Sequence, residues 1–176
     1  MLLSEKRLQS IESSLDGWRK SAPDVEEGNA LLMRLIRASS LGISSCVDPI
    51  LRESGLTESS FHTLVVTTAA GAHGITASGL CAEVGQGAAN MTRILKLLET
   101  LGLAKLRADS NDARRRRAIA TARGKALVHS YGKKLAPVIN ESFSDLSEKE
   151  KSQLHDLLYK VMHSLGRAEL MARKLG

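Results

Sequence analysis

The stretch Asp112-Ala113-Arg114-Arg115-Arg116-Arg117 places four consecutive arginines beside one carboxylate. A guanidinium is planar, permanently charged and shaped to bind phosphate through two hydrogen bonds. Narrow minor grooves of DNA concentrate negative potential and attract such groups. The run therefore predicts contact with a polyanion, against the alternative that it is a solvated turn with four unordered side chains.

A second set of polar residues lies some twenty positions earlier, in Asn90-Met91-Thr92-Arg93. A threonine hydroxyl binds phosphate, and the amide of an asparagine matches the major-groove edge of adenine. We expect Asn90, Thr92 and Arg93 to reach DNA, unless Arg93 pairs with Glu99 instead. Ala88 is a candidate for apolar contact with thymine methyl groups, and Gln86 for contact with phosphate.

Charge distribution along the chain agrees with these two sets. Residues 57–126 carry 10 Lys/Arg against 5 Asp/Glu, whereas residues 1–56 carry 7 against 8. The excess of positive charge within the net +6 is thus concentrated in the middle third. Such a segment is typical of a surface that binds nucleic acid.

Composition limits the class of protein. The 176 residues are 43% hydrophobic but only 3% aromatic, which predicts a core of aliphatic side chains and a helix-rich fold. Cys46 and Cys81 are too few and too far apart for a disulfide framework or a metal site. We see no signal peptide, membrane-spanning run, nucleotide-binding loop or catalytic motif, so we expect a cytoplasmic protein without cofactor, metal or enzyme activity.

Hydrophobic periodicity predicts the elements that position these residues. One helix is expected over residues 4–19, and a longer one over 26–53 that Gly42 and Pro49 bend or interrupt, with Gly55 as its stop. Thr57 and Thr76 are expected to cap helices. The remaining expected elements are helices over 57–70, 77–84, 88–101 and 121–140, short strands over 103–106 and 117–121, and a last helix entered through the capping box Ser147–Glu150.

This order predicts a mainly α fold with a small two-stranded β-wing. Residues 57–121 form a winged helix–turn–helix lobe, while residues 1–56 and 122–176 form the helices of an all-α dimerisation lobe. The helix over 88–101 would enter the major groove and the wing over 107–117 the minor groove. Because the outer helices have wide apolar faces, burial against a second copy predicts a homodimer.

At these residues the chain resembles the MarR family of bacterial regulators. The resemblance covers about residues 26–165 and rests on several stretches in the correct order. They are Val47-Asp48-Pro49, Gly55-Leu56-Thr57, Phe61 with Leu64, Thr76-Ala77-Ser78-Gly79-Leu80, Asn90-Met91-Thr92-Arg93-Ile94, Leu98-Glu99, Gly102-Leu103, Asp112-Ala113-Arg114-Arg115, Thr121 with Gly124, and Leu146-Ser147 with Glu150.

The resemblance implies a ligand-responsive repressor that binds double-stranded DNA at a short inverted repeat as a homodimer. It assigns Arg114 to the minor groove, with Asp112 orienting its guanidinium and Arg115 beside it, and Arg93 to phosphate or base. Arg116 and Arg117 would add attraction to phosphates.

The resemblance also implies a small aromatic or acidic effector. The segment around Trp18 is similar to the N-terminal extension of the urate-responsive branch, and the efflux-repressor branch has such an extension as well. We therefore name Trp18, Arg37 and His62 as candidate ligand residues, although His62 stands where the urate branch carries an acid. Plain packing of Trp18 and His62 is the alternative. Two other functions stay open, a non-DNA interaction module and a redox-sensing regulator that uses Cys46 or Cys81.

Overall fold

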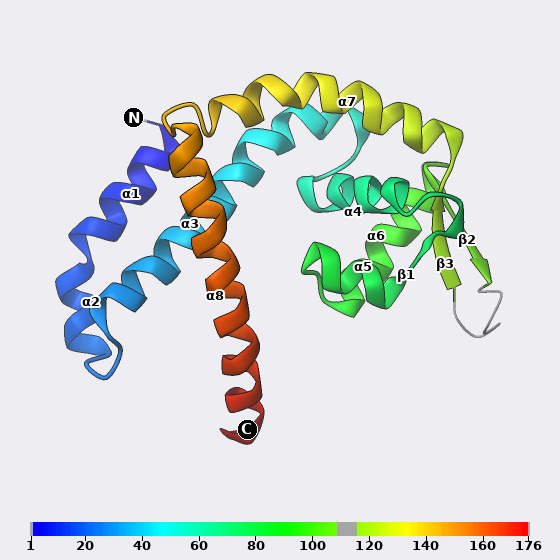
Figure 1. Ribbon diagram of the computed structural model, residues 1–176. Coiled ribbons are helices and arrows are strands. Elements are labelled where there is room, and N and C mark those ends of the chain that lie inside the picture. The colour runs from blue at the N-terminus through cyan, green and yellow to red at the C-terminus, as the bar shows by residue number, and fades with distance from the viewer. Residues whose placement is uncertain (1, 109–115, 176) are drawn as a thin grey trace. The chain divides into compact units, whose positions relative to one another are not determined.

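The computed structural model describes residues 2–108 and 116–175. It is mainly helical with one small antiparallel sheet, which confirms the predicted fold class (Figure 1). The chain divides into two compact units, Met1–Leu135 and Ala136–Gly176, which are described separately. The division into lobes over 1–56, 57–121 and 122–176 stays a prediction.

The first helical segment is broken in two. Helix α1 spans Leu3–Ser13 and α2 spans Leu15–Ser21, so the prediction of one helix over residues 4–19 is wrong. Ser14, at the break, donates its hydroxyl to the carbonyl of Ser10 at 2.6 Å. Serine side chains that bond to nearby carbonyls compete with helix geometry in this way. Arg34 of the next helix then binds the carbonyl of Ile11 at 3.1 Å, near the end of α1.

Helix α3 spans Glu27–Leu51 without interruption, so of the two expectations for Gly42 and Pro49, interruption is wrong and a bend stays a prediction. Pro49 lies in the last turn, where the helix soon gives way to the 3₁₀ helix η1 (Arg52–Ser54). Gly55 then adopts a left-handed conformation with φ of 73°, as expected for a helix stop. By length and composition alone, Glu27–Ser54 is apolar enough to cross a membrane, which is weak evidence because core helices pass the same test.

The helix–turn–helix follows the predicted boundaries closely. The Thr57 hydroxyl accepts a hydrogen bond from the amide of Ser60, and that of Thr76 accepts one from Gly79, which confirms both caps. The elements are α4 (Glu58–Ala69), the 3₁₀ helix η2 (Gly71–His73), strand β1 (Ile75–Thr76), α5 (Ala77–Val84) and α6 (Ala88–Thr100).

The sheet has three strands in the order β1-β3-β2, with β2 spanning Ala104–Ala108 and β3 spanning Arg116–Ala120. The predicted two-stranded hairpin is therefore incomplete. Strand β1 is only two residues long, too short for an alternating pattern, yet Ile75 pairs with Ala118 and Thr76 with Arg117. The alanines that weaken the strand signal are buried in β3, where a small side chain lets the helices approach.

Two clusters of buried side chains hold the lobe together. The larger joins the end of α3 to α4, α6, the sheet and α7 (Ala122–Glu141). The smaller lies among α5, α6 and β3, around Leu80 and Met91. Residues of α6 belong to both clusters, so its buried face fixes its orientation in the lobe.

The last helix, α8, spans Glu148–Leu175. The predicted capping box is confirmed, because Glu150 accepts hydrogen bonds from the hydroxyl and amide of Ser147 while the Ser147 hydroxyl accepts from the Glu150 amide. The hydrogen bond from the Ser147 hydroxyl, with that from its amide, lowers the pKa of Glu150 below its ordinary value.

Asp48 joins α3 to the helix–turn–helix. Its Oδ1 accepts a hydrogen bond of 2.6 Å from the backbone N–H of Glu58, the first residue of α4. That amide has no partner within its own helix, and the carboxylate lies at the positive end of the helix dipole.

Removal of this carboxylate is expected to lower the free energy of unfolding. We expect Asp48→Ala to cost about 1–2 kcal/mol, as for other helix caps, and Asp48→Asn, which keeps an acceptor oxygen, to cost less. Urea denaturation followed by circular dichroism, at one protein concentration, measures both. An Asp48→Ala variant as stable as the parent would contradict a capping role.

Candidate nucleic-acid interface

Helix α6 divides its residues between a buried apolar face and an exposed polar face. Met91, Ile94, Leu95 and Leu98 are buried in the two clusters. The exposed face carries the side chains that were predicted to reach DNA together with one further lysine, namely Asn90, Thr92, Arg93 and Lys96. Burial of one face thus fixes which side chains the other presents.

The start of α6 offers backbone amides. Gly87 is the N-cap and supplies no capping side chain, and the next residues, Ala88 and Ala89, are exposed. The first amides of a helix have no partner within it, and they favour anions such as phosphate. Thr92 donates its hydroxyl to the carbonyl of Ala88 at 2.9 Å, so in this structure the oxygen is left as an acceptor.

Three polar side chains form a hydrogen-bonded chain at this end of α6. The amide of Asn90 donates to Oε1 of Gln86 at 2.6 Å, and the amide of Gln86 donates to the hydroxyl of Ser59 at 3.3 Å. Gln86 is half-buried in the turn between α5 and α6, and Ser59 lies in the first turn of α4. These hydrogen bonds thus link α4 to α6 through the turn that precedes α6.

Arg93 is exposed on α6. Among the described residues, no salt bridge joins it to Glu99 or to another acid, so the structure gives no support to the alternative interpretation of Arg93. Lys96, one helical turn further on, is exposed as well. Two cations therefore lie on the polar face of α6.

The sheet is basic on its solvent side. Lys105, Arg107 and Arg117 alternate with buried Ala104 and Ala118 and half-buried Leu106, and Arg107 lies opposite Arg117 across the strands. Like charges in this position are destabilising, unless other groups offset them. Arg117 donates to the carbonyl of Gly74 at 3.1 Å, which ties β3 to the turn before β1.

The predictions from sequence omit Lys96 and Lys105 as individual contacts. Both contribute to the positive charge of residues 57–126, which is the only signal that pointed to them. Asp112, Arg114 and Arg115, the predicted tip of the wing, lie outside the described residues. Their roles stay predictions.

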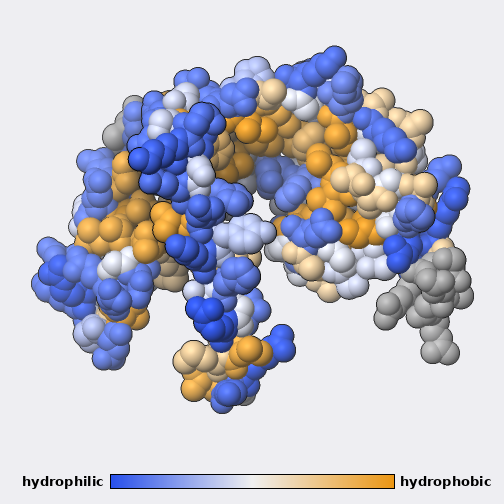
Figure 2. Space-filling model, viewed as in Figure 1, coloured by the Kyte–Doolittle hydropathy of each residue, from blue (hydrophilic) through white to orange (hydrophobic). Residues whose placement is uncertain are grey.

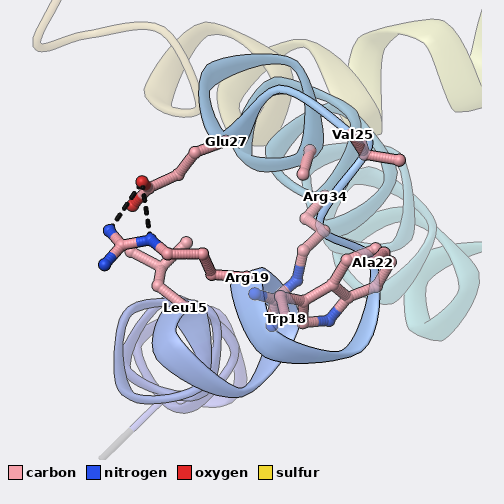
Figure 3. Close-up of a pocket in the computed structure, with 8 residues that line it drawn as sticks. Leu15, Trp18, Arg19, Ala22, Val25, Glu27 and Arg34 are labelled. Carbon is pink, nitrogen blue, oxygen red and sulfur yellow. Dashed lines mark hydrogen bonds and ion pairs between the residues drawn. The ribbon is translucent and has the colours of Figure 1, made fainter.

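Trp18 lies over a small hollow between α2 and α3 (Figure 3). Arg34 stacks on its ring, with the guanidinium carbon 5.5 Å from the ring centroid. Arg34 also donates to Ser14 and to the carbonyl of Ile11, so it fastens α1 and α2 to α3. Beside them, the hydrogen bond from Arg19 to Glu27 at 2.6 Å raises the pKa of that arginine.

The three candidate ligand residues do not meet in this hollow. Its lining includes Trp18 but neither Arg37, which is exposed on α3, nor His62, which is exposed on α4. The stacking on Arg34 gives Trp18 a packing role in this structure. Cys46 is exposed and Cys81 half-buried, and no group of three or more potential metal ligands occurs among the described residues.

The sequence and fold of the helix–turn–helix segment are similar to those of known proteins. Residues 54–115 match the sequence profile of the MarR family. The match begins in η1, includes all of α4, α5 and α6, and reaches the predicted wing. A search of curated proteins finds no significant match to the chain.

Solved structures of MarR-type proteins share the fold. The MepR–DNA complex of S. aureus has 25% sequence identity and a TM-score of 0.67, over 74% of this chain and 95% of that chain. CouR from Rhodococcus jostii RHA1 bound to p-coumaroyl-CoA has 22% identity and a TM-score of 0.67, over 74% and 90%. Apo MarR from E. coli has 24% identity and a TM-score of 0.62, over 74% and 96%.

Proposed function

We propose that this protein is a DNA-binding transcriptional regulator of the MarR type. The observation that carries the proposal is that the sequence comparison and the structure point to the same segment. The segment that matches the family profile, residues 54–115, contains the helix whose exposed face holds Asn90, Arg93 and Lys96. The S. aureus MepR structure of similar fold is a complex with DNA.

In this proposal, α6 enters the major groove with its N-terminal residues against base edges. The width of that groove admits an α-helix. Arg93 and Lys96 then contact phosphate or guanine, while Lys105 and Arg107 add sequence-independent attraction. The wing, with Asp112, Arg114 and Arg115, would occupy the neighbouring minor groove.

We further propose that the protein acts as a homodimer on a short inverted repeat and represses transcription there. The outer helices leave large apolar side chains uncovered, and Figure 2 displays such side chains on the surface of the α1–α3 segment and at the C-terminal end of α8. Uncovered apolar patches mark interaction surfaces. The exposed apolar residues of α3 and α8 include Leu32, Met33, Ile36, Leu41, Ile43, Leu154, Leu157, Leu158, Val161, Met162 and Leu165.

The α8 residues have the spacing of a helix-pairing seam. Positions 154, 158, 161, 165, 168, 172 and 175 alternate in steps of four and three and carry Leu, Leu, Val, Leu, Ala, Ala and Leu. This heptad pattern places all seven on one stripe, as in helices that pack against a partner helix. A second copy of the same chain offers the same stripe, which suits a twofold contact.

A charge in this seam is expected to separate the dimer. In Leu165→Asp, two carboxylates would be buried against each other without partners, so we expect monomers in light scattering coupled to size exclusion. Leu170→Asp is the matched control, because Leu170 is 61% exposed and lies on the opposite side of α8. If Leu170→Asp alone gives monomers, or if both variants remain dimers, the proposal that α8 pairs through this stripe is wrong.

The proposed effector is a small aromatic or acidic compound, in keeping with an N-terminal extension like those of the urate-responsive and efflux-repressor branches. CouR, of the same fold, was solved with a CoA thioester bound. Trp18, Arg37 and His62 stay the candidate contacts. A thermal-shift screen of urate, salicylate and drug-like aromatics, repeated with Trp18→Phe, tests the proposal through the change in melting temperature.

DNA from the region upstream of the protein's own gene tests the proposed function in a gel shift at two salt concentrations. Specific binding that weakens steeply at the higher salt is expected, because basic residues displace counterions from phosphates. Absence of specific, salt-sensitive binding would favour a non-DNA interaction module. Loss of binding on oxidation, prevented by Cys46→Ser or Cys81→Ser, would favour the redox-sensing alternative.

A further inference from the structure

We propose that Gln86 is a positioning residue that fixes the side-chain amide of Asn90 for recognition of one A·T base pair, and that Ser59 holds Gln86 in place. The inference rests on the proposed DNA-binding function. It replaces the expectation that Gln86 contacts phosphate with a different role, in which Gln86 acts on DNA only through Asn90.

The hydrogen bonds run in one direction through the helix–turn–helix. Nδ2 of Asn90 donates to Oε1 of Gln86 at 2.6 Å, and Nε2 of Gln86 donates to Oγ of Ser59 at 3.3 Å. Gln86 and Ser59 are half-buried, whereas Asn90 is exposed. The exposed residue Asn90 is therefore connected, through the side chains of Gln86 and Ser59, to the first turn of α4.

The anchored asparagine still has the groups that adenine requires. An amide nitrogen carries two hydrogens, and Asn90 uses one of them on Gln86. The other hydrogen and Oδ1 form a donor beside an acceptor, which matches N7 and the N6 amino group of adenine in the major groove. Asn90 can thus remain bonded to Gln86 while it recognises the base.

Anchoring also decides which way the amide faces. A free asparagine on a helix surface rotates between two amide orientations, and only one presents donor and acceptor in the order that a given adenine needs. The bond to Gln86 selects one of them before DNA binds, and such preorganisation reduces the ordering cost of binding. We therefore expect Gln86 to contribute to sequence preference more than to general affinity.

Ser59 supplies the fixed end of the chain. Ser59 belongs to α4, which packs against α5 and α6. Its neighbour in sequence, Ser60, is buried in the cap of the same helix. Because the hydroxyl of Ser59 is attached to this rigid turn, loss of the hydroxyl should loosen Gln86 and, through it, Asn90.

The test measures sequence preference and salt dependence for the full-length protein. Selection from a randomised duplex library first yields the preferred site, and fluorescence anisotropy then compares that site with its single base-pair variants at several salt concentrations. We expect the parent to prefer A·T at one position of each half-site by about tenfold to a hundredfold. Gln86→Met keeps the length of the side chain but neither hydrogen bond, and it should reduce that preference to less than about threefold, as should Asn90→Ala.

Two further variants separate positioning from simple loss of a contact. Gln86→Glu keeps an acceptor for Asn90, so it should retain the base preference even if its charge lowers affinity for every duplex. Ser59→Ala should lose part of the preference. Gln9→Met, the same substitution on the exposed side of α1, should change nothing. Circular dichroism of each variant confirms that it is folded.

The outcomes are distinct. If Gln86→Met keeps the A·T preference but loses affinity for all duplexes alike, Gln86 binds phosphate and the positioning role is wrong. If Gln86→Glu loses the preference as fully as Gln86→Met, the bond to Asn90 is not what matters. A parent that selects no sequence at all overturns the proposed function, and the inference with it.

Discussion

A Gly124→Ala variant is expected to lose about 3 kcal/mol or more of its free energy of unfolding, because the added methyl group has no space. A Cβ at Gly124 would lie 2.1 Å from the carbonyl oxygen of Leu103 and 3.2 Å from Cδ1 of Leu64. The carbonyl belongs to the backbone before β2 and accepts a hydrogen bond from the amide of Thr121, so it cannot move aside cheaply.

Gly132 is the matched control for this substitution. It lies in the same helix, α7, and nothing is within 4 Å of the position its Cβ would take. Alanine in the middle of a helix is favoured over glycine by about 0.5–1 kcal/mol, so Gly132→Ala should be slightly more stable than the parent. Urea denaturation at one protein concentration measures both. Equal stability of the two variants would mean that α7 does not approach Leu103 as described.

Arg93→Ala is expected to weaken binding to duplex DNA by about tenfold to a hundredfold, as is typical when an arginine loses contacts with base or phosphate. Arg93 is exposed on α6 and forms no ion pair with any of the described residues, so its removal should leave the fold intact. Arg114→Ala, in the predicted wing, is expected to have an effect of the same size.

Arg52→Ala provides the control for charge. Arg52 is an exposed arginine in η1, outside the polar face of α6 and the sheet. Anisotropy titrations compare the DNA affinities of the three variants at one salt concentration. Their melting temperatures are measured in parallel. If Arg93→Ala weakens binding no more than Arg52→Ala does, Arg93 contributes only to the net charge. If Arg93→Ala fails to fold, its role is structural.

Local signals predicted most of the helix boundaries. Thr57, Thr76 and Ser147 cap helices where expected, and Gly55 and Gly102 stop them with positive φ. These signals succeed because a cap or a left-handed glycine depends on residues three or four positions apart. The exposed side of α6 was predictable for the same reason, since its apolar residues repeat at helical spacing.

The errors concern features that depend on distant residues. The break at Ser14 coincides with contacts from Arg34, twenty positions away, and β1 exists only because β3 pairs with it. The hydrogen bond from Gln86 to Ser59 spans 27 positions, so no local sequence pattern predicts it. Likewise, Trp18 suggested a ligand contact from sequence, whereas its stacking partner Arg34 comes from another helix.

Selection from a randomised duplex library, followed by measurement of the mass of the complex, tests the central claim most directly. We predict that the full-length protein enriches a short inverted repeat, that two chains bind each site, and that affinity falls steeply as salt increases. A protein that enriches no sequence and binds all duplexes alike, or none, would contradict the claim that this chain is a DNA-binding regulator.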